Sequence, residues 1–162
     1  MPIALLLLIA AALLAHYPAT AALRAQEPGA PAASALDYEF FKTKVQPILL
    51  AKREGNTRCV ACHSKGTPMR FSPLSPGATT WNEEESRRNF QVIAARVVPH
   101  SLNQSKLLLH PLLADGGGTF YHNGGKHWKS FLDPEWQTIA NWVCGRKPNE
   151  KLVELTGACE AD

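Results

Sequence analysis

The string RCVACHSKG, residues 58–66, constrains this chain more than any other part of its sequence. Two cysteines separated by two residues are followed directly by a histidine, giving Cys59, Cys62 and His63. Residues three apart lie on the same face of a helical turn, so both sulfur atoms are expected to point the same way. A C-x-x-C-H string is compatible with covalent haem attachment, with half of a zinc site, or with a dithiol redox pair.

The other two cysteines argue against zinc, and the lack of strands argues against a redox pair. A zinc site needs about four ligands, commonly from two paired sets, whereas Cys144 and Cys159 do not form a second C-x-x-C. A thioredoxin-like pair belongs beside a βαβ pattern, and the sequence shows no strands of useful length. The spacing therefore favours one haem c, with Cys59 and Cys62 as covalent thioethers and His63 as the proximal axial iron ligand.

The N-terminus is typical of an exported chain. Residues 3–15 form one apolar run, which has the length of a signal-peptide core and is too short to span a bilayer alone. The first residues, MPI, lack the usual positive charge, so an uncleaved anchor over 3–23 is the alternative to a cleaved signal peptide within 1–25. Both interpretations predict a periplasmic or other extracytoplasmic location.

The leader is followed by a predicted linker and one domain. Residues 26–36, QEPGAPAASAL, are rich in Pro, Ala and Gly and have no apolar period, which predicts a flexible linker. The remainder, 37–162, has the length of one domain. In an oxidising compartment Cys144 and Cys159 are expected to form a disulfide, the alternative being two free buried thiols.

The apolar periodicity predicts an all-α domain. Apolar residues at helical spacing favour helices beginning after Asp37, Asn82 and Asp133, each of which is a good N-cap, and a shorter helix within 103–113. Pro47 is expected to kink or shorten the first helix, Pro99 to end the second, and Gly145 to end the last. A long glycine-rich loop, ADGGGTFYHNGGKHW, precedes the last helix. The net charge of +3 is mild and no basic stripe is present, which argues against a nucleic-acid partner.

Several segments together resemble a known family. They are F-x-x-x-V-x-P-I-L before the C-x-x-C-H string, then SKLLLHPL (105–112), HNGG (122–125) and the closing DPEWQTIANWV (133–143). The chain resembles exported monohaem c-type cytochromes related to the planctomycete-type cytochrome c domain, over roughly residues 37–145. The resemblance implies a cytochrome c-like fold of about four to five helices around one haem, with the terminal helices crossing beside it, and a role in electron transfer.

The sixth iron ligand is less constrained by the sequence than the fifth. His122 is the first choice because Gly124 and Gly125 beside it let the backbone approach a flat porphyrin, and because it matches the histidine of the family's H-x-G-G segment. Met69 and His127 are the alternatives. His/His ligation would give a lower reduction potential than His/Met ligation.

These observations predict an electron-transfer protein rather than an enzyme. It would act on redox protein partners, either as a soluble carrier or as the cytochrome subunit of a membrane complex such as a photosynthetic reaction centre or oxidase. Membrane contact through residues 3–23 would favour the subunit. The alternative is a peroxidase-like haem enzyme or gas sensor with an open distal site, in which His122 or His127 serves as an acid–base group without binding iron.

Overall fold

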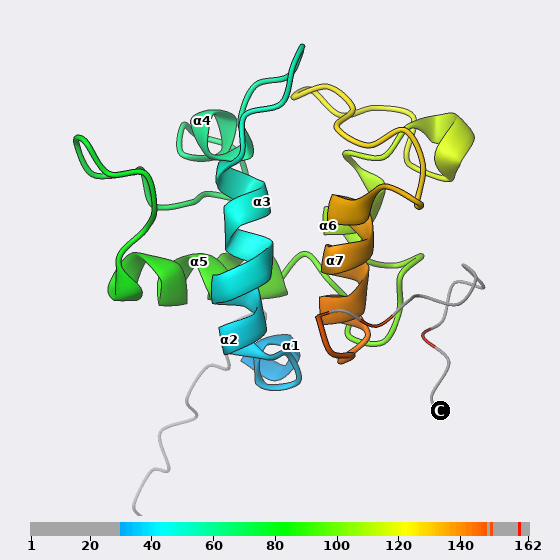
Figure 1. Cartoon of the computed structure of the whole chain (residues 1–162), viewed down its shortest axis with the longest axis horizontal. Coiled ribbons are helices and arrows are strands. Elements are labelled where there is room, and N and C mark those ends of the chain that lie inside the picture. The colour runs from blue at the N-terminus through cyan, green and yellow to red at the C-terminus, as the bar shows by residue number, and fades with distance from the viewer. Residues whose placement is uncertain (1–29, 149, 151–158, 160–162) are drawn as a thin grey trace, which may run out of the picture.

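The computed structural model describes residues 30–148, 150 and 159 (Figure 1). This part of the chain is built from helices and loops, and within it no strand forms beyond the isolated bridges Val98–Ser101 and Leu112–Trp128. The predicted all-α class is confirmed at this level. The elements are α1 (Ala30–Ser34), α2 (Tyr38–Phe40), η1 (Phe41–Val45), α3 (Gln46–Leu50), α4 (Cys59–His63), α5 (Glu83–Ala94), α6 (Lys106–Leu109), η2 (Ala114–Gly116) and α7 (Pro134–Val143).

The first predicted helix forms as three consecutive pieces, α2, η1 and α3. Asp37 caps it as expected, accepting a hydrogen bond from the Phe40 N–H. The middle piece, η1, is a turn of π-helix that ends immediately before the Gln46–Pro47 pair. Pro47 has no N–H to donate and its ring crowds the preceding turn, and a π-turn is one way a helix accommodates such a disruption.

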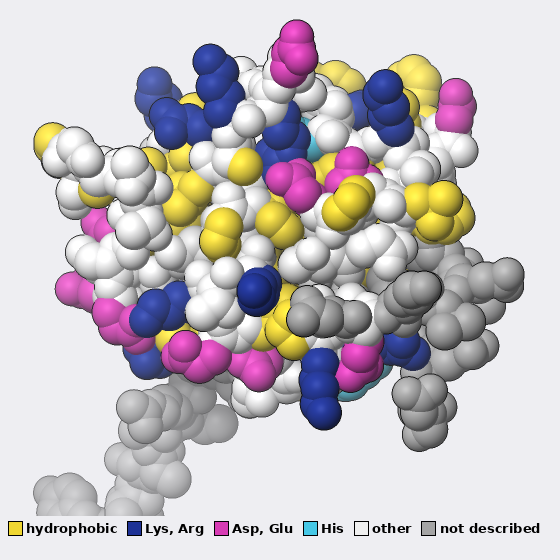
Figure 2. All heavy atoms as spheres, viewed as in Figure 1, with side chains coloured by type: hydrophobic (Ala, Val, Ile, Leu, Met, Phe, Trp, Pro, Cys, Tyr) yellow, Lys and Arg dark blue, Asp and Glu magenta, His cyan; other side chains and the backbone are white. Residues whose placement is uncertain are grey.

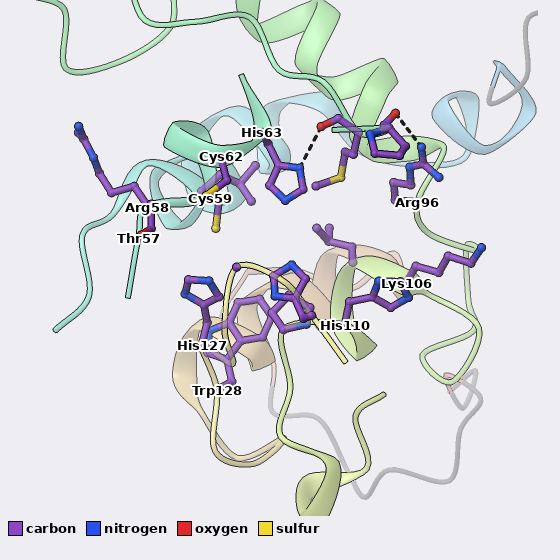
Figure 3. A pocket seen from close by; sticks show the side chains of 17 residues that line it. Thr57, Arg58, Cys59, Cys62, His63, Arg96, Lys106, His110, His127 and Trp128 are labelled. Carbon is purple, nitrogen blue, oxygen red and sulfur yellow. Dashed lines mark hydrogen bonds between the residues drawn. The ribbon is translucent and has the colours of Figure 1, made fainter. Parts of the chain in front are cut away.

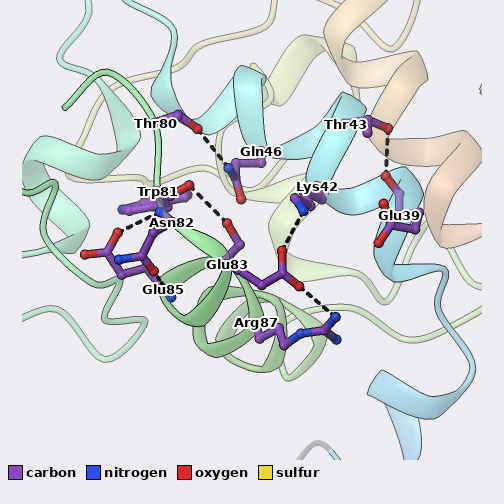
Figure 4. Close-up of polar contacts among 11 residues, drawn as sticks. Glu39, Lys42, Thr43, Gln46, Thr80, Trp81, Asn82, Glu83, Glu85 and Arg87 are labelled. Carbon is purple, nitrogen blue, oxygen red and sulfur yellow. Dashed lines mark hydrogen bonds and ion pairs between the residues drawn. The ribbon is translucent and has the colours of Figure 1, made fainter.

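The second predicted helix, α5, begins where expected and ends early. Asn82 and Glu85 form a capping box, in which each side chain accepts a hydrogen bond from the other residue's backbone N–H (Figure 4). The helix ends at Ala94 rather than near Pro99. The helix thus ends five residues before Pro99, and the Arg96 carbonyl then accepts a hydrogen bond from the Leu107 N–H at the start of α6.

The last helix, α7, packs against η1, the middle piece of the first predicted helix. Its N-cap is Asp133 and Gly145 follows its end with φ +69°, both as predicted, and Pro134 occupies the first turn. The rings of Phe41 in η1 and Trp142 in α7 lie 5.7 Å apart, and the Trp142 indole N–H donates to the Asp37 carbonyl. The core therefore joins the two ends of the domain.

The Cys144–Cys159 disulfide is present, with Cα atoms 5.4 Å apart, which confirms the predicted pairing. It joins Cys159 to Cys144, the residue that follows α7. Cations and anions are interspersed over the face seen in Figure 2, in line with the mild net charge.

The predicted leader lies outside the described residues, as does the start of the predicted linker. The described part of that linker differs from a flexible tether, because Ala30–Ser34 forms α1, and Ala33 and Leu36 are buried in the core. No helix in the described part of the chain is long and apolar enough to cross a membrane.

Candidate functional site

All six candidate residues from the sequence line one cavity: Cys59, Cys62, His63, Met69, His122 and His127. The cavity has a volume of about 250 Å³, and the free space including its open mouth reaches about 970 Å³. Figure 3 shows its two walls, with Cys59, Cys62 and His63 on one side and His110, His127 and Trp128 on the other. We call the first the CXXCH wall and the second the loop wall, which is formed by residues 106–128.

The CXXCH wall is carried by α4. Both cysteines are free thiols that reach the cavity, while Val60 between them is buried in the core and fixes the helix in place. Burial raises the pKa of the Cys59 thiol. The Phe71 N–H donates to the His63 carbonyl at 2.8 Å, which folds the chain after α4 back alongside it.

The His63 imidazole has a defined tautomer. Its Nδ1 lies 2.9 Å from the Met69 carbonyl oxygen, which can only accept a hydrogen bond. Nδ1 must therefore carry the proton, and it also lies 2.9 Å from the Thr67 hydroxyl. Burial lowers the pKa of His63, so the neutral ring with an unprotonated Nε2 is favoured. An imidazole held in this way is ready to bind a metal through Nε2.

His122 has the same arrangement on the other side. Its Nδ1 lies 2.6 Å from the Gly125 carbonyl oxygen, so this ring also keeps Nε2 unprotonated when neutral. The ring centroids of His63 and His122 are 6.4 Å apart and the ring planes differ by 16°. Two imidazoles from distant parts of the sequence thus lie nearly parallel across one cavity, each with a free nitrogen lone pair.

The two glycines after His122 have clear structural roles. A Cβ added at Gly124 would lie 3.2 Å from Cε1 of the His122 ring, tighter than nine in ten real Cβ contacts. Gly125 has φ +82°, in the left-handed region that favours glycine. The HNGG segment is therefore a turn that leaves room for the His122 imidazole itself.

The alternative ligands are placed differently. The Met69 carbonyl accepts a hydrogen bond from His63 Nδ1, which fixes the Met69 backbone on the CXXCH wall. His127 reaches the cavity with its ring centroid 6.0 Å from that of His122, and its Nδ1 is buried without a hydrogen-bond partner. Burial lowers the pKa of His127 to about 4. Of the remaining histidines, His110 also lines the cavity, whereas His100 is exposed and lies outside it.

The loop wall is held by backbone contacts that the sequence does not reveal. The Lys126 ammonium donates to the carbonyls of His110 and Thr119, closing the loop that carries His122. The backbone N–H groups of His127 and Trp128 both point to the Pro111 carbonyl, at 2.7 and 3.2 Å. These contacts order the glycine-rich segment into a wall.

Within residues 30–148, 150 and 159, no three His, Cys, Asp or Glu side chains converge on one point as a protein-only metal site would require. Comparisons with protein family models, with curated proteins and with solved structures found no match to the chain.

Proposed function

We propose that this chain is a monohaem c-type cytochrome that transfers electrons, with His63 and His122 as the two axial ligands. The observation that carries the proposal is the pair of parallel imidazoles with free Nε2 atoms, 6.4 Å apart between ring centroids. A nitrogen–metal bond is about 2 Å long and the ring centroid lies about 1 Å beyond the nitrogen, so two imidazoles on opposite sides of one metal have centroids about 6 Å apart. The spacing fits this geometry.

The other residues of the cavity fit a porphyrin. Cys59 and Cys62, three residues apart on α4, would hold it as thioethers beside His63. Leu49, Leu107 and Trp128 give the cavity apolar surfaces that exclude water, and Arg58, Arg96 and Lys106 add cationic groups that suit propionates. When bound, the haem iron supplies a one-electron couple. The chain sets its potential through His/His ligation and the apolar walls.

The fold and the loop support the rest of this proposal. Contact between η1 and α7 through Phe41 and Trp142 suits a cytochrome c-like fold with crossing terminal helices. Phe120 and Tyr121, 93% and 69% exposed, immediately precede His122 and offer aromatic contact surface to a redox partner. The apolar N-terminal run supports export, either as a soluble periplasmic carrier or as an anchored subunit of a reaction centre or oxidase.

Intact mass and absorption spectra of the natively expressed protein test the proposal. We expect the mass of one covalently bound haem and a low-spin, six-coordinate spectrum in both oxidation states. His122→Ala should convert the haem to high spin, while His100→Ala, outside the cavity, should leave the spectrum unchanged. A low-spin spectrum that persists in His122→Ala would reject His122 as ligand, and a mass without haem would reject the function.

The buried, unpartnered Nδ1 of His127 favours one second candidate, a haem enzyme or gas sensor with an open distal site. In that protein His127 would hold or move a proton beside a vacant coordination position. Rapid carbon monoxide binding by the wild-type ferrous protein would support this candidate. Slow or absent binding would support the electron carrier.

A further inference from the structure

An ion pair between Arg53 and Glu135 links the side of the CXXCH wall to the side of the loop wall. Arg53 lies between α3 and α4, on the side of the CXXCH wall, and Glu135 lies in the first turn of α7. The Arg53 Nε and Nη2 atoms lie 2.6 and 2.5 Å from Glu135 Oε2. The residues are separated by 82 positions in the sequence, so this contact forms only in the folded chain.

The Arg53 side chain is fixed on its own side. It is 14% exposed, and its Nη2 donates to the Ile48 carbonyl in α3 at 2.8 Å. Burial raises the pKa of the Cys59 thiol, and the Arg53 guanidinium opposes that shift. Arg53 thus links α3 to Glu135, with Nη2 contacting both the Ile48 carbonyl and the Glu135 carboxylate.

Glu135 is fixed to the loop wall through a second hydrogen bond. Its Oε2 accepts from the Trp128 indole N–H at 3.2 Å as well as from Arg53. Trp128 is buried, lines the cavity and follows His127 directly. The Trp128 backbone N–H donates to the Pro111 carbonyl, and its carbonyl accepts from the Leu113 N–H. A displacement of Glu135 would therefore move Trp128 and, through these hydrogen bonds, the loop wall that carries His122.

We propose that Arg53 and Glu135 are positioning residues, a clamp that sets the separation of the two cavity walls and so holds His122 opposite His63. This inference rests on the proposed function in one respect: the separation matters because both imidazoles bind the same iron. A coordinate bond of about 2 Å tolerates little stretching, so a wall that moves outward would release the sixth ligand before the fold is lost. The other interpretation is that the pair supports stability alone.

The experiment compares three variants of the full-length protein. Glu135→Gln keeps the size and an acceptor for Trp128 but removes the charge, and Arg53→Lys keeps the charge but removes the fork that reaches Ile48 and Glu135 together. The control is Glu83→Gln, which breaks the Lys42–Glu83 pair at 2.5 Å between η1 and α5, outside the cavity (Figure 4). Because two clamp variants are used, failure of one to fold leaves the other to decide.

The first readout is amide hydrogen exchange, which requires no haem. In both clamp variants we expect exchange in the loop wall, residues 106–128, to rise about tenfold or more, since local opening of this wall becomes easier, with no such rise in Glu83→Gln. Wild-type exchange rates in this segment, or an equal rise in the control, would overturn the clamp.

The second readout is carbon monoxide binding to the ferrous haem. We expect both clamp variants to bind it about tenfold faster than the wild type, because the sixth position opens more often, while the control binds at the wild-type rate. Wild-type binding by folded clamp variants would overturn the positioning role. If the wild-type protein carries no haem, the proposed function fails, and the exchange data on the same chain still test whether Arg53 and Glu135 hold the loop wall in place.

Discussion

At the scale of single residues, two backbone carbonyls decide what the cavity can bind. The Met69 and Gly125 oxygens each accept a hydrogen bond from Nδ1–H of one histidine, His63 and His122 respectively. Each ring therefore keeps the Nε2 lone pair free and is held by a partner outside the metal's own ligands. The Thr67 hydroxyl also donates to the Met69 carbonyl, so it fixes the acceptor that orients His63.

Gly124→Ala tests how closely the His122 ring is fitted to its turn. The new Cβ would lie 3.2 Å from His122 Cε1, so we expect the ring to shift and the low-spin fraction of the haem-loaded protein to fall. Gly55→Ala is the control, because Gly55 has φ +72° with nothing within 4 Å of the added carbon. That control should cost about 1–2 kcal/mol of stability through backbone strain and leave the spectrum unchanged. An unaltered low-spin spectrum in Gly124→Ala would contradict the tight fit.

His127 makes the stability of the domain depend on pH. Burial, with added repulsion from Arg53, His122 and His63, lowers its pKa to about 4, against about 6.5 in an unfolded chain. The unfolded state therefore binds more protons between these values, and the free energy of unfolding falls as pH drops from about 6.5 to 4. We expect His127→Gln to reduce the pH dependence of the unfolding free energy by up to the contribution of one bound proton. Urea unfolding at several pH values measures this dependence. A slope equal to that of the wild type would show that His127 titrates normally in the folded protein.

At the scale of elements, helix ends are where local sequence decides the structure. Asn82 before Glu83–Glu85 and Asp133 before Pro134 give caps whose partners lie within three residues, so these starts could be predicted. Pro47 predicted a disruption of the first helix but not its form as a π-turn. The early end of α5 had no local signal, because it accompanies the Leu107–Arg96 hydrogen bond between distant positions.

The capping box of α5 can be tested by Asn82→Ala. In the wild type the Glu85 backbone N–H donates to Asn82 Oδ1 at 2.9 Å. The substitution removes this acceptor and should lower the free energy of unfolding by about 1 kcal/mol. Glu84→Gln in the same turn is the control, since its ion pair with Arg88 is long, at 3.5 Å, and largely exposed. It should change stability by less than about 0.5 kcal/mol. Equal effects of the two variants in chemical denaturation would contradict a role for the cap.

At the scale of the whole molecule, the candidate site was only half predictable. The C-x-x-C-H string fixes its own geometry, because one turn of α4 brings Cys59, Cys62 and His63 together. The choice among His122, His127 and Met69 depends on which loop covers the cavity, and that is set by contacts such as Lys126 with His110. Arg53 and Glu135 carried no sequence signal, since a lone ion pair between distant positions has no local pattern.

The Cys144–Cys159 disulfide is expected to stabilise the domain without shaping the cavity. Neither cysteine lines the cavity, and the bridge spans 15 positions at the far end of α7. In the chain-entropy model a loop of this size contributes about 3 kcal/mol by restricting the unfolded chain. We expect the double variant Cys144→Ala/Cys159→Ala to lose about that much stability in urea unfolding, with the visible spectrum of the haem-loaded protein unchanged. The double variant avoids leaving a free thiol, and reduction of the wild-type bridge should reproduce its stability. A spectral change on loss of the bridge would show instead that the tail, through α7 and Glu135, helps to hold His122 opposite His63.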